Sequence, residues 1–238
     1  MPVQILDMPV TQIAQETWDT RTFRLQPPAE FDSQWLPGQF ITTYLPADPK
    51  TRKAYSLSNS PLDGHFLEIT IKQMGDFGAR FYETARVGMK LPVIPPRGKF
   101  ILPDDPARPL MLISGGSGVT PYRSMMRWIV QKKLPTRVVT LYSVRTPPDI
   151  IFQREFEELC RQNPNFSFHV TCTRLPAEDD SWQGRRGRVS PAMVEELTPD
   201  RDRAVYYVCG GHEFVRDVAA MLHGMGFPKE RVLFEDWG

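Results

Sequence analysis

The chain has 238 residues, which is enough for one large domain or two small ones. Hydrophobic residues make up 41% and charged residues 24%, a globular composition that excludes collagen-like, coiled-coil and disordered chains. The 29 basic residues against 28 acidic ones leave a net charge of +1, so we expect no nucleic-acid partner and no polybasic membrane anchor.

The cellular location is predicted from two features that we looked for in the sequence, a membrane-spanning helix and a signal peptide. No apolar run approaches the ~20 residues of a membrane-spanning helix, and the N-terminus lacks a signal-peptide layout. We therefore expect a cytoplasmic protein without membrane insertion. Cys160, Cys172 and Cys209 are predicted to be free thiols, and no cysteine or histidine spacing predicts a metal site.

The first hundred residues contain short β-type runs separated by turn residues. We expect strands at Gln39–Leu45, Ala54–Ser58 and Phe66–Lys72, with one helix at Phe77–Ala85. Many prolines lie in this half, and proline is excluded from central strands. The pattern predicts many short antiparallel strands that close into a small barrel, a domain spanning residues 1–103.

A polar, proline-bounded linker, Leu102–Pro106, precedes a different pattern. From residue 109 to 238, buried strands alternate with amphipathic helices, which predicts a parallel-sheet α/β domain. The expected strands are Pro109–Ser114, Arg137–Ser143, Ser167–Thr173, Ala204–Cys209 and Val232–Phe234. The expected helices are Pro121–Lys132, Ile150–Arg161, Pro191–Leu197 and Glu213–Met225.

Two glycine-rich turns follow buried strands of this second domain. Gly115–Pro121 joins a strand to a helix, and Cys209–Gly211 does the same farther along. Glycine allows close approach of a ligand, and a helix N-terminus favours a pyrophosphate. A dinucleotide site and a plain structural turn both remain open, because the spacing is not the G-x-G-x-x-G of the classical fold.

Five motifs in register resemble the ferredoxin–NADP+ reductase superfamily over essentially the whole chain. They are Pro37–Phe40, Lys53–Ser56, Gly115–Pro121, Cys209–Gly211 and Phe234–Glu235. The resemblance implies an N-terminal flavin-binding β-barrel followed by an NAD(P)-binding α/β domain. It implies bound FAD, with FMN as the less favoured flavin, and NADPH or NADH as co-substrate.

The resemblance also implies which residues hold the flavin. Tyr55 would lie against the isoalloxazine and Ser56 near its N5 atom, and Trp237 would cover the exposed flavin face. The other implied flavin-site residues are Lys53, Ala54, Ile71, Lys72, Gly78, Ala79 and Arg80. Two of these depart from the family pattern. Lys53 replaces an arginine and loses its bidentate fork, and Gly78 stands where a serine or threonine is usual.

The resemblance places Cys209 beside the nicotinamide and Glu235 near the hydride-transfer site. Ser56, Cys209 and Glu235 are thus the candidate catalytic residues. The implied nucleotide-binding residues are Gly115, Gly116, Gly118, Val119, Thr120, Pro121, Gly210 and Gly211. Arg145, Arg174 and Arg188 would hold the 2′-phosphate of NADPH, whereas Asp149 near the ribose would favour NADH. We expect NADPH by a narrow margin.

Three functions are compatible with these motifs. The first is a reductase that passes hydride from NAD(P)H to FAD and then electrons to a separate ferredoxin, flavodoxin or oxygenase component. The second is a flavin reductase that uses flavin as a substrate, which Lys53 and Gly78 favour. The third is an electron-transfer subunit of a larger complex or a binding module. The sequence names neither the acceptor nor the oligomeric state, and it leaves open a longer protein with a fused ferredoxin domain.

Overall fold

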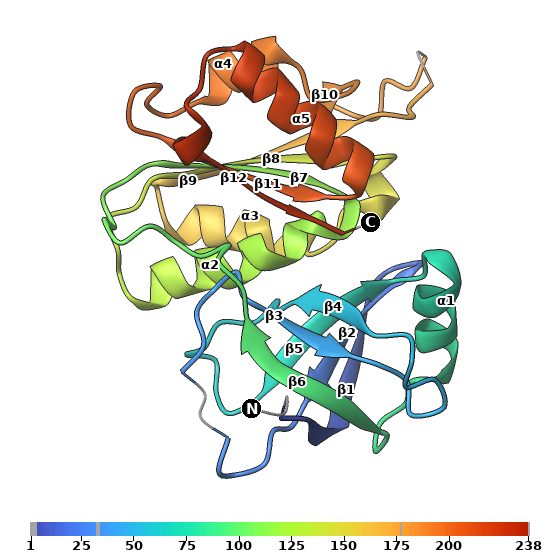
Figure 1. The fold of residues 1–238 in the computed structure, drawn as a ribbon. Helices are drawn as coiled ribbons and strands as arrows, with labels where there is room; N and C mark the ends of the chain where they lie inside the picture. Colours follow the sequence, from blue (N-terminus) through green and yellow to red (C-terminus); the bar gives the residue numbers. More distant parts are fainter. Residues whose placement is uncertain (1–3, 32–33, 177, 238) are drawn as a thin grey trace. The chain divides into compact units, whose positions relative to one another are not determined.

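The computed structural model describes residues 4–31, 34–176 and 178–237, which form two compact units (Figure 1). The first unit runs to Leu102 and also contains Thr120–Trp128, most of helix α2 (Thr120–Gln131). The second unit contains Pro103–Val119 and the chain from Ile129 onward. Helix α2 therefore starts in the first unit, although its sequence lies within the predicted domain 109–238.

The first unit is an antiparallel sheet of six strands. The strands are β1 (Leu6–Thr17), β2 (Thr20–Leu25), β3 (Phe40–Thr43), β4 (Lys53–Ser56), β5 (Leu67–Lys72) and β6 (Lys90–Arg97). Their order across the sheet is β4-β3-β6-β1-β2-β5. The two outer strands meet through a bridge between Leu57 and Ile69 and a 2.8 Å hydrogen bond from the Ser58 amide to the Glu68 carbonyl. This contact closes the sheet into the predicted barrel.

Strands β1 and β6 contradict the expectation of short strands without proline. β1 has 12 residues and contains Pro9, and β6 lies inside the sheet although it contains Pro92, Pro95 and Pro96. The pairing of β3 with β6 shifts register between Phe40 and Thr42, opposite Pro95 and Pro96. Proline is tolerated at such an irregularity because no ladder hydrogen bond needs its missing N–H.

The core of the barrel is built from apolar side chains of all its strands and of helix α1 (Gly75–Thr84). Phe81 of α1 is fully buried and packs edge-on against Phe23, with 5.1 Å between ring centroids. The helix begins two residues before the predicted Phe77. Its Gly75 has φ +66°, a conformation that glycine adopts without strain.

The second unit is a parallel sheet of six strands. It contains β7 (Leu110–Gly115), β8 (Val138–Val144), β9 (Phe166–Cys172), β10 (Arg185–Arg186), β11 (Val205–Gly210) and β12 (Val232–Asp236). The order is β10-β9-β8-β7-β11-β12, so the direction of winding reverses between β7 and β11. Ligands of open parallel sheets bind at such a switch point, beyond the carboxyl ends of the strands.

Helices cover both faces of the parallel sheet (Figure 1). α5 (His212–Gly224) packs Val215, Val218 and Leu222 on one face, where α4 (Pro191–Leu197) also lies. α3 (Gln153–Gln162) lies on the other face and stacks Phe156 on Phe168 at 5.0 Å. Short 3-10 turns lie at η1 (Gly116–Val119), η2 (Pro147–Asp149) and η3 (Lys229–Arg231). The predicted α/β domain is confirmed.

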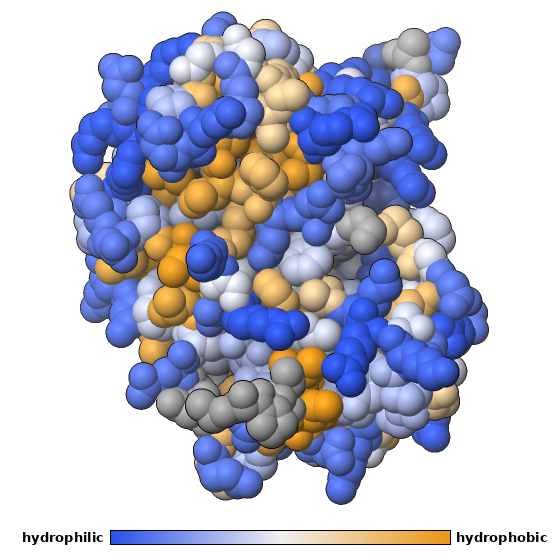
Figure 2. Space-filling model, in the orientation of Figure 1, coloured by the Kyte–Doolittle hydropathy of each residue, from blue (hydrophilic) through white to orange (hydrophobic). Residues whose placement is uncertain are grey.

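Element ends differ modestly from the sequence prediction. α3 begins at Gln153 rather than Ile150, because Pro147–Asp149 forms its own turn and Phe152 adopts φ +60°. β10 was not expected, because a strand of two residues is too short to show the alternating hydrophobic pattern of a strand. Figure 2 shows hydrophilic residues over most of the visible surface, with smaller hydrophobic patches in both units. Within the described ranges, no helix is long and apolar enough to cross a membrane.

Candidate functional site

Strand β4 carries the first group of predicted flavin residues. Tyr55 is half-buried, and its ring lies 6.4 Å from the rings of both Phe77 and Phe81. Burial raises the pKa of the Tyr55 phenol, so this side chain stays neutral. Ser56 is buried, Ala54 is half-buried and Lys53 is exposed. An aromatic ring supported from α1 and an exposed cation thus lie on one short strand, as a flavin and its phosphate require.

The second group lies where β5 ends and α1 begins. Ile71 is buried in the barrel core, and the Lys72 ammonium lies 2.8 Å from the Asp19 carboxylate. Burial alone would raise the pKa of Asp19, but hydrogen bonds from Lys72, Thr17 and Thr20 hold it below its ordinary value. Lys72 therefore forms an ion pair within the barrel. The sequence analysis assigned Lys72 to the flavin site and did not predict this ion pair.

Helix α1 offers the anion-binding end that the resemblance implies. Met74 precedes it and makes no capping hydrogen bond through its side chain, so the first-turn amides are without a side-chain cap. Ala79 is half-buried. Arg80 pairs with Asp48 at 2.8 Å and with Asp76 at 3.0 Å, which fixes its guanidinium within this turn. The uncapped amides fit a pyrophosphate.

Close packing explains why residue 78 is glycine, an explanation that the sequence alone did not provide. It is buried in α1, and a Cβ atom there would lie 2.7 Å from the Lys72 carbonyl oxygen. That oxygen belongs to the backbone, so it cannot move aside cheaply. The helix approaches β5 so closely that the usual serine or threonine would not fit. The departure at this position reflects close packing rather than a degraded site.

Three residues at the carboxyl ends of neighbouring strands of the second unit lie in one row across the sheet, at its switch point. Cys209 in β11 pairs with Ser114 in β7 on one side and with Glu235 in β12 on the other. Paired residues of neighbouring strands present their side chains on the same face. The row therefore joins the strand before Gly115, the predicted nicotinamide cysteine and the predicted hydride-site glutamate.

Three glycines make a tight cradle beside this row. A Cβ on Gly118 would lie 2.2 Å from the Cys209 carbonyl oxygen, and one on Gly210 would lie 2.8 Å from the Phe214 ring. Gly115 is equally restricted, with Phe214 at 2.9 Å. These distances exclude any side chain, so the two glycine turns pack directly together. This packing holds the two turns side by side beyond β7 and β11, at the switch point of the sheet where a dinucleotide fits.

The remaining residues of the two turns frame this cradle. Gly116 has φ +56°, and Gly211 precedes α5 as its N-cap. Val119 and Thr120 are buried, and Thr120 and Pro121 are the first residues of α2. Phe214 was missed by sequence reasoning, since nothing in its local pattern distinguishes it from a core residue of α5.

Cys209 is held as a neutral thiol. Burial and the neighbouring Glu235 carboxylate raise the pKa of Cys209 well above its usual value, although the Trp237 side chain donates a hydrogen bond to it. The Trp237 amide donates to the Gly210 carbonyl at 3.0 Å. The structure thus places Trp237 at Cys209 and Gly210, within the second unit. The Ser114 hydroxyl is buried and has no hydrogen-bond partner in the part of the chain that the structure describes.

The three arginines that we predicted to bind the 2′-phosphate of NADPH follow successive strands of the sheet. Arg145 comes directly after β8, and Arg188 lies two residues after β10. The Arg174 amide donates to the Arg145 carbonyl at 2.9 Å, which brings these two residues side by side. All three side chains are exposed. Asp149 is buried instead and accepts hydrogen bonds from the Thr146 amide and hydroxyl, so its carboxylate stabilises the η2 turn.

Two family models match the chain. Residues 7–101 match the oxidoreductase FAD-binding domain, and residues 112–220 match the oxidoreductase NAD-binding domain. The chain belongs to the ferredoxin–NADP+ reductase superfamily. The predicted family, fold class and cofactor pair are thereby confirmed. The glycine cradle and the uncapped α1 amides fit NAD(P) and FAD respectively. Within the described residues, no His, Cys, Asp and Glu cluster that could hold a metal ion is present.

Members of this superfamily similar to the chain include named reductases. The chain is 34% identical over 230 residues to the glycine betaine monooxygenase reductase subunit of Chromohalobacter salexigens, covering 95% of this chain and 62% of that protein. It is 27% identical to the reductase component of propane 2-monooxygenase from Rhodococcus jostii, covering 99% and 64%. The chain thus spans less than two thirds of the length of these relatives.

Solved structures of the superfamily share the fold. A cytochrome P450 reductase from Amycolatopsis aligns with a TM-score of 0.86 at 23% identity, covering 98% of this chain and 70% of that one. A ferredoxin NADP+ reductase from Neisseria gonorrhoeae, with FAD and NADP bound, aligns with a TM-score of 0.82 at 18% identity, covering 98% and 99%. Both alignments cover 98% of this chain, so both domains share their fold with these structures.

Proposed function

We propose that the chain is a flavoprotein reductase that oxidises NAD(P)H and delivers electrons to a separate acceptor, such as a ferredoxin, a flavodoxin or an oxygenase component. The row of Ser114, Cys209 and Glu235 beside the glycine cradle carries this proposal. It lies in the same chain as an FAD-binding domain. The names of the relatives favour an oxygenase component as acceptor, because two of them are reductases of monooxygenase systems.

The barrel residues bind and orient the flavin in this proposal. Bound FAD would supply a hydride acceptor and a store from which electrons leave singly or as a pair. Tyr55 would lie on the ring, held from behind by Phe77 and Phe81. Ser56 would hydrogen-bond to the ring, and Lys53 with the first amides of α1 would hold phosphate. The amides of Gly75, Asp76 and Phe77, the first three residues of α1, would be the ones available to an anion.

The second unit binds the coenzyme. Gly116 and Gly211, where a Cβ would meet nothing within 4 Å, leave room for the dinucleotide to approach the backbone. Cys209 contributes a neutral, polarisable surface for the nicotinamide, because a thiolate there would be both buried and next to Glu235. Glu235 would place a carboxylate at the reacting end. Trp237 donates a hydrogen bond to Cys209 and would have to move aside for nicotinamide to bind there.

The coenzyme we propose is NADPH. Arg145 and Arg174 are adjacent, exposed and held together through their backbones, which suits a 2′-phosphate. Arg188 would add a third positive charge. Electrostatic repulsion between Asp149 and this phosphate would be weak, because the Asp149 carboxylate is buried and accepts hydrogen bonds from Thr146. NADH remains the alternative, because no arginine here is shown to hold a phosphate.

A flavin reductase is the second candidate function. Lys53 supports it, because lysine binds phosphate without the bidentate fork of arginine. The packing at Gly78 weakens it, since that glycine is required by the closeness of α1 to β5. An electron-transfer subunit of a larger complex is the third candidate. It is supported by the observation that this chain covers only 62% of a relative that is itself named a reductase subunit.

One experiment separates the three candidates. The purified, dialysed protein is examined for flavin absorption and is then mixed anaerobically with NADPH or NADH. Flavin bands that persist through dialysis and bleach on mixing support the proposed reductase, and the faster coenzyme identifies the preferred one. Colourless protein that oxidises NADPH only after free flavin is added supports the flavin reductase. Colourless, inactive protein supports the subunit.

A further inference from the structure

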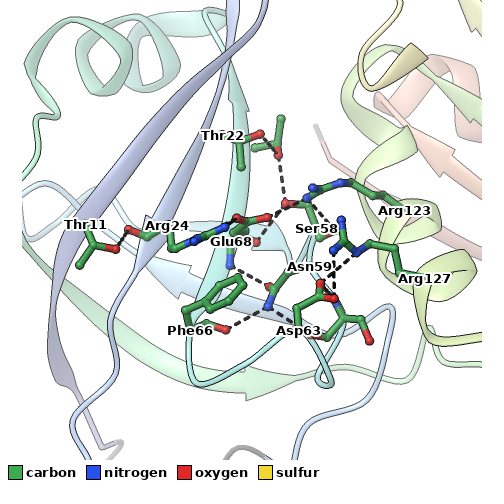
Figure 3. A network of polar contacts seen from close by, with 12 residues as sticks. Thr11, Thr22, Arg24, Ser58, Asn59, Asp63, Phe66, Glu68, Arg123 and Arg127 are labelled. Atoms are coloured by element: carbon green, nitrogen blue, oxygen red, sulfur yellow. Dashed lines mark hydrogen bonds and ion pairs between the residues drawn. The ribbon is translucent and has the colours of Figure 1, made fainter. Parts of the chain in front are cut away.

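A buried network of carboxylates and arginines joins the barrel to helix α2 (Figure 3). The Glu68 side chain is 8% exposed, and one of its oxygens lies 2.8 Å from Arg123 of α2. The other oxygen accepts two hydrogen bonds from Arg24 of β2, at 2.8 and 3.0 Å. One carboxylate of β5 therefore holds an arginine of the barrel and an arginine of the helix together.

A second pair repeats this attachment one helical turn later. Asp63, whose side chain is 5% exposed, lies 2.9 Å from the Arg127 Nε atom and accepts a hydrogen bond from its Nη2 at 3.0 Å. Arg123 and Arg127 are four residues apart, so they project from the same face of α2. Two attachment points on one face fix both the position of a helix and its rotation about its axis.

The barrel end of the network lies directly after the predicted flavin residues. Arg123 also donates to the Ser58 carbonyl at 3.2 Å, two residues beyond Ser56. The neighbouring Asn59 accepts a hydrogen bond from the Glu68 amide at 2.8 Å and donates to the Phe66 carbonyl at 2.9 Å. The loop that follows β4 is thus held rigidly around Glu68, as Figure 3 shows.

The helix end of the network begins at the glycine turn. Thr120 follows η1 without any intervening residue and starts α2, three positions before Arg123. Buried ion pairs contribute little net stability compared with apolar packing, so we assign this network a role in geometry. We propose that Arg123 and Arg127, with Glu68 and Asp63, are positioning residues that hold the first turns of α2, the helix that directly follows the glycine turn, in one orientation on the barrel.

This inference rests on the proposed function for its kinetic consequence. A loosened α2 would leave both ligand sites built but would lose the fixed placement of the helix that directly follows the glycine turn, so both ligands would bind and flavin reduction would slow. An error of about 1 Å in such placement lowers a rate by about a hundredfold. Loss of the network should therefore lower the rate of flavin reduction more than it weakens the binding of either ligand.

The test compares Arg123→Met with Arg24→Met. Both variants remove one guanidinium from Glu68, but only the first detaches α2. We measure flavin content, the Kd of NADP+, and the rate of flavin bleaching at saturating NADPH or NADH. Arg123→Met should slow bleaching about tenfold to a hundredfold with flavin content and Kd within about twofold of wild type, and Arg123→Lys should recover part of the rate. Arg24→Met should change all three values less than about twofold.

Amide hydrogen exchange gives a readout that does not depend on activity. Arg123→Met should raise exchange over residues 116–128 and leave β7 protected, whereas Arg24→Met should leave exchange over 116–128 unchanged. Arg127→Met, whose side chain is more exposed, provides a milder variant if Arg123→Met fails to fold. Unchanged exchange and unchanged bleaching in both α2 variants would overturn the inference, as would equal slowing by Arg24→Met. Failure of wild-type flavin to bleach would reject the proposed function, while the exchange result would still decide the role of the network.

Discussion

Gly78 illustrates how a single residue can look like a defect in sequence and be required by packing. A Cβ at this position would lie 2.7 Å from a backbone oxygen of β5. We therefore expect Gly78→Ser, which restores the residue type common in the family, to lower the free energy of unfolding by about 1–3 kcal/mol. Urea denaturation followed by circular dichroism measures this change.

The control for this prediction is Gly224→Ala. Gly224 also lies in a helix, but a Cβ there would meet nothing within 4 Å. Alanine has the higher helix propensity, so this variant should be as stable as the wild type or up to about 1 kcal/mol more stable. A stable Gly78→Ser variant that also binds flavin more tightly would contradict the packing argument.

Cys209 leads to a prediction about pH. Its thiol has a raised pKa because it is buried beside Glu235, so it remains protonated through the neutral range. The rate of flavin reduction should then show no ionisation of this group between about pH 6 and about pH 9. Cys209→Ser should lower the rate without changing the shape of the pH profile. A step in the wild-type profile that the serine variant lacks would show that the thiol titrates.

At the scale of elements, the sequence located most strands and helices and predicted the barrel, but it missed the barrel strands β1, β2 and β6. The parallel strands were predictable because each is a continuous buried run flanked by turn residues. β1 and β6 were not, because proline is ordinarily excluded from central strands and both contain it. Only the register shift between β3 and β6 shows how Pro95 and Pro96 are accommodated. Pairing partners lie far apart in sequence, and local composition does not reveal them.

The candidate site shows the same limit. The glycine turns were predictable because glycine near a strand end has few other uses. Phe214 and Ser114 were not, because their importance depends on which strand lies next to which. The network of Glu68 and Arg123 is equally invisible in sequence, since a glutamate in a strand and an arginine in a helix are ordinarily solvent-exposed.

The 3-10 turn η1 leads to a prediction about coenzyme binding. Gly118 lies in this turn against Cys209, where a Cβ would be 2.2 Å from the carbonyl oxygen. Gly118→Ala must push the turn away from β11, which should cost about 1–3 kcal/mol of stability and weaken NADP+ binding at least about tenfold. A fluorescence titration with NADP+ and a thermal melt measure the two effects. Wild-type affinity in Gly118→Ala would show that the turn need not touch β11.

At the scale of the whole molecule, α2 belongs to both compact units. Its residues through Trp128 lie in the first, and the rest lie in the second. A continuous helix of this kind should couple the unfolding of the two units, so scanning calorimetry should record a single transition. Replacing Arg123 and Arg127 together with methionine should separate it into two. Arg24→Met is the control and should keep one transition, and two separate transitions in the wild type would contradict the coupling.

The burial of the cysteines has a consequence for chemical durability. The structure records Cys160, Cys172 and Cys209 as free thiols. Burial raises the pKa of Cys160 to about 11 and that of Cys172 to about 11, and Cys209 is also raised. Peroxides attack the thiolate form, which is scarce at neutral pH for all three groups. The three cysteine thiols of this chain are thereby poor targets for peroxides.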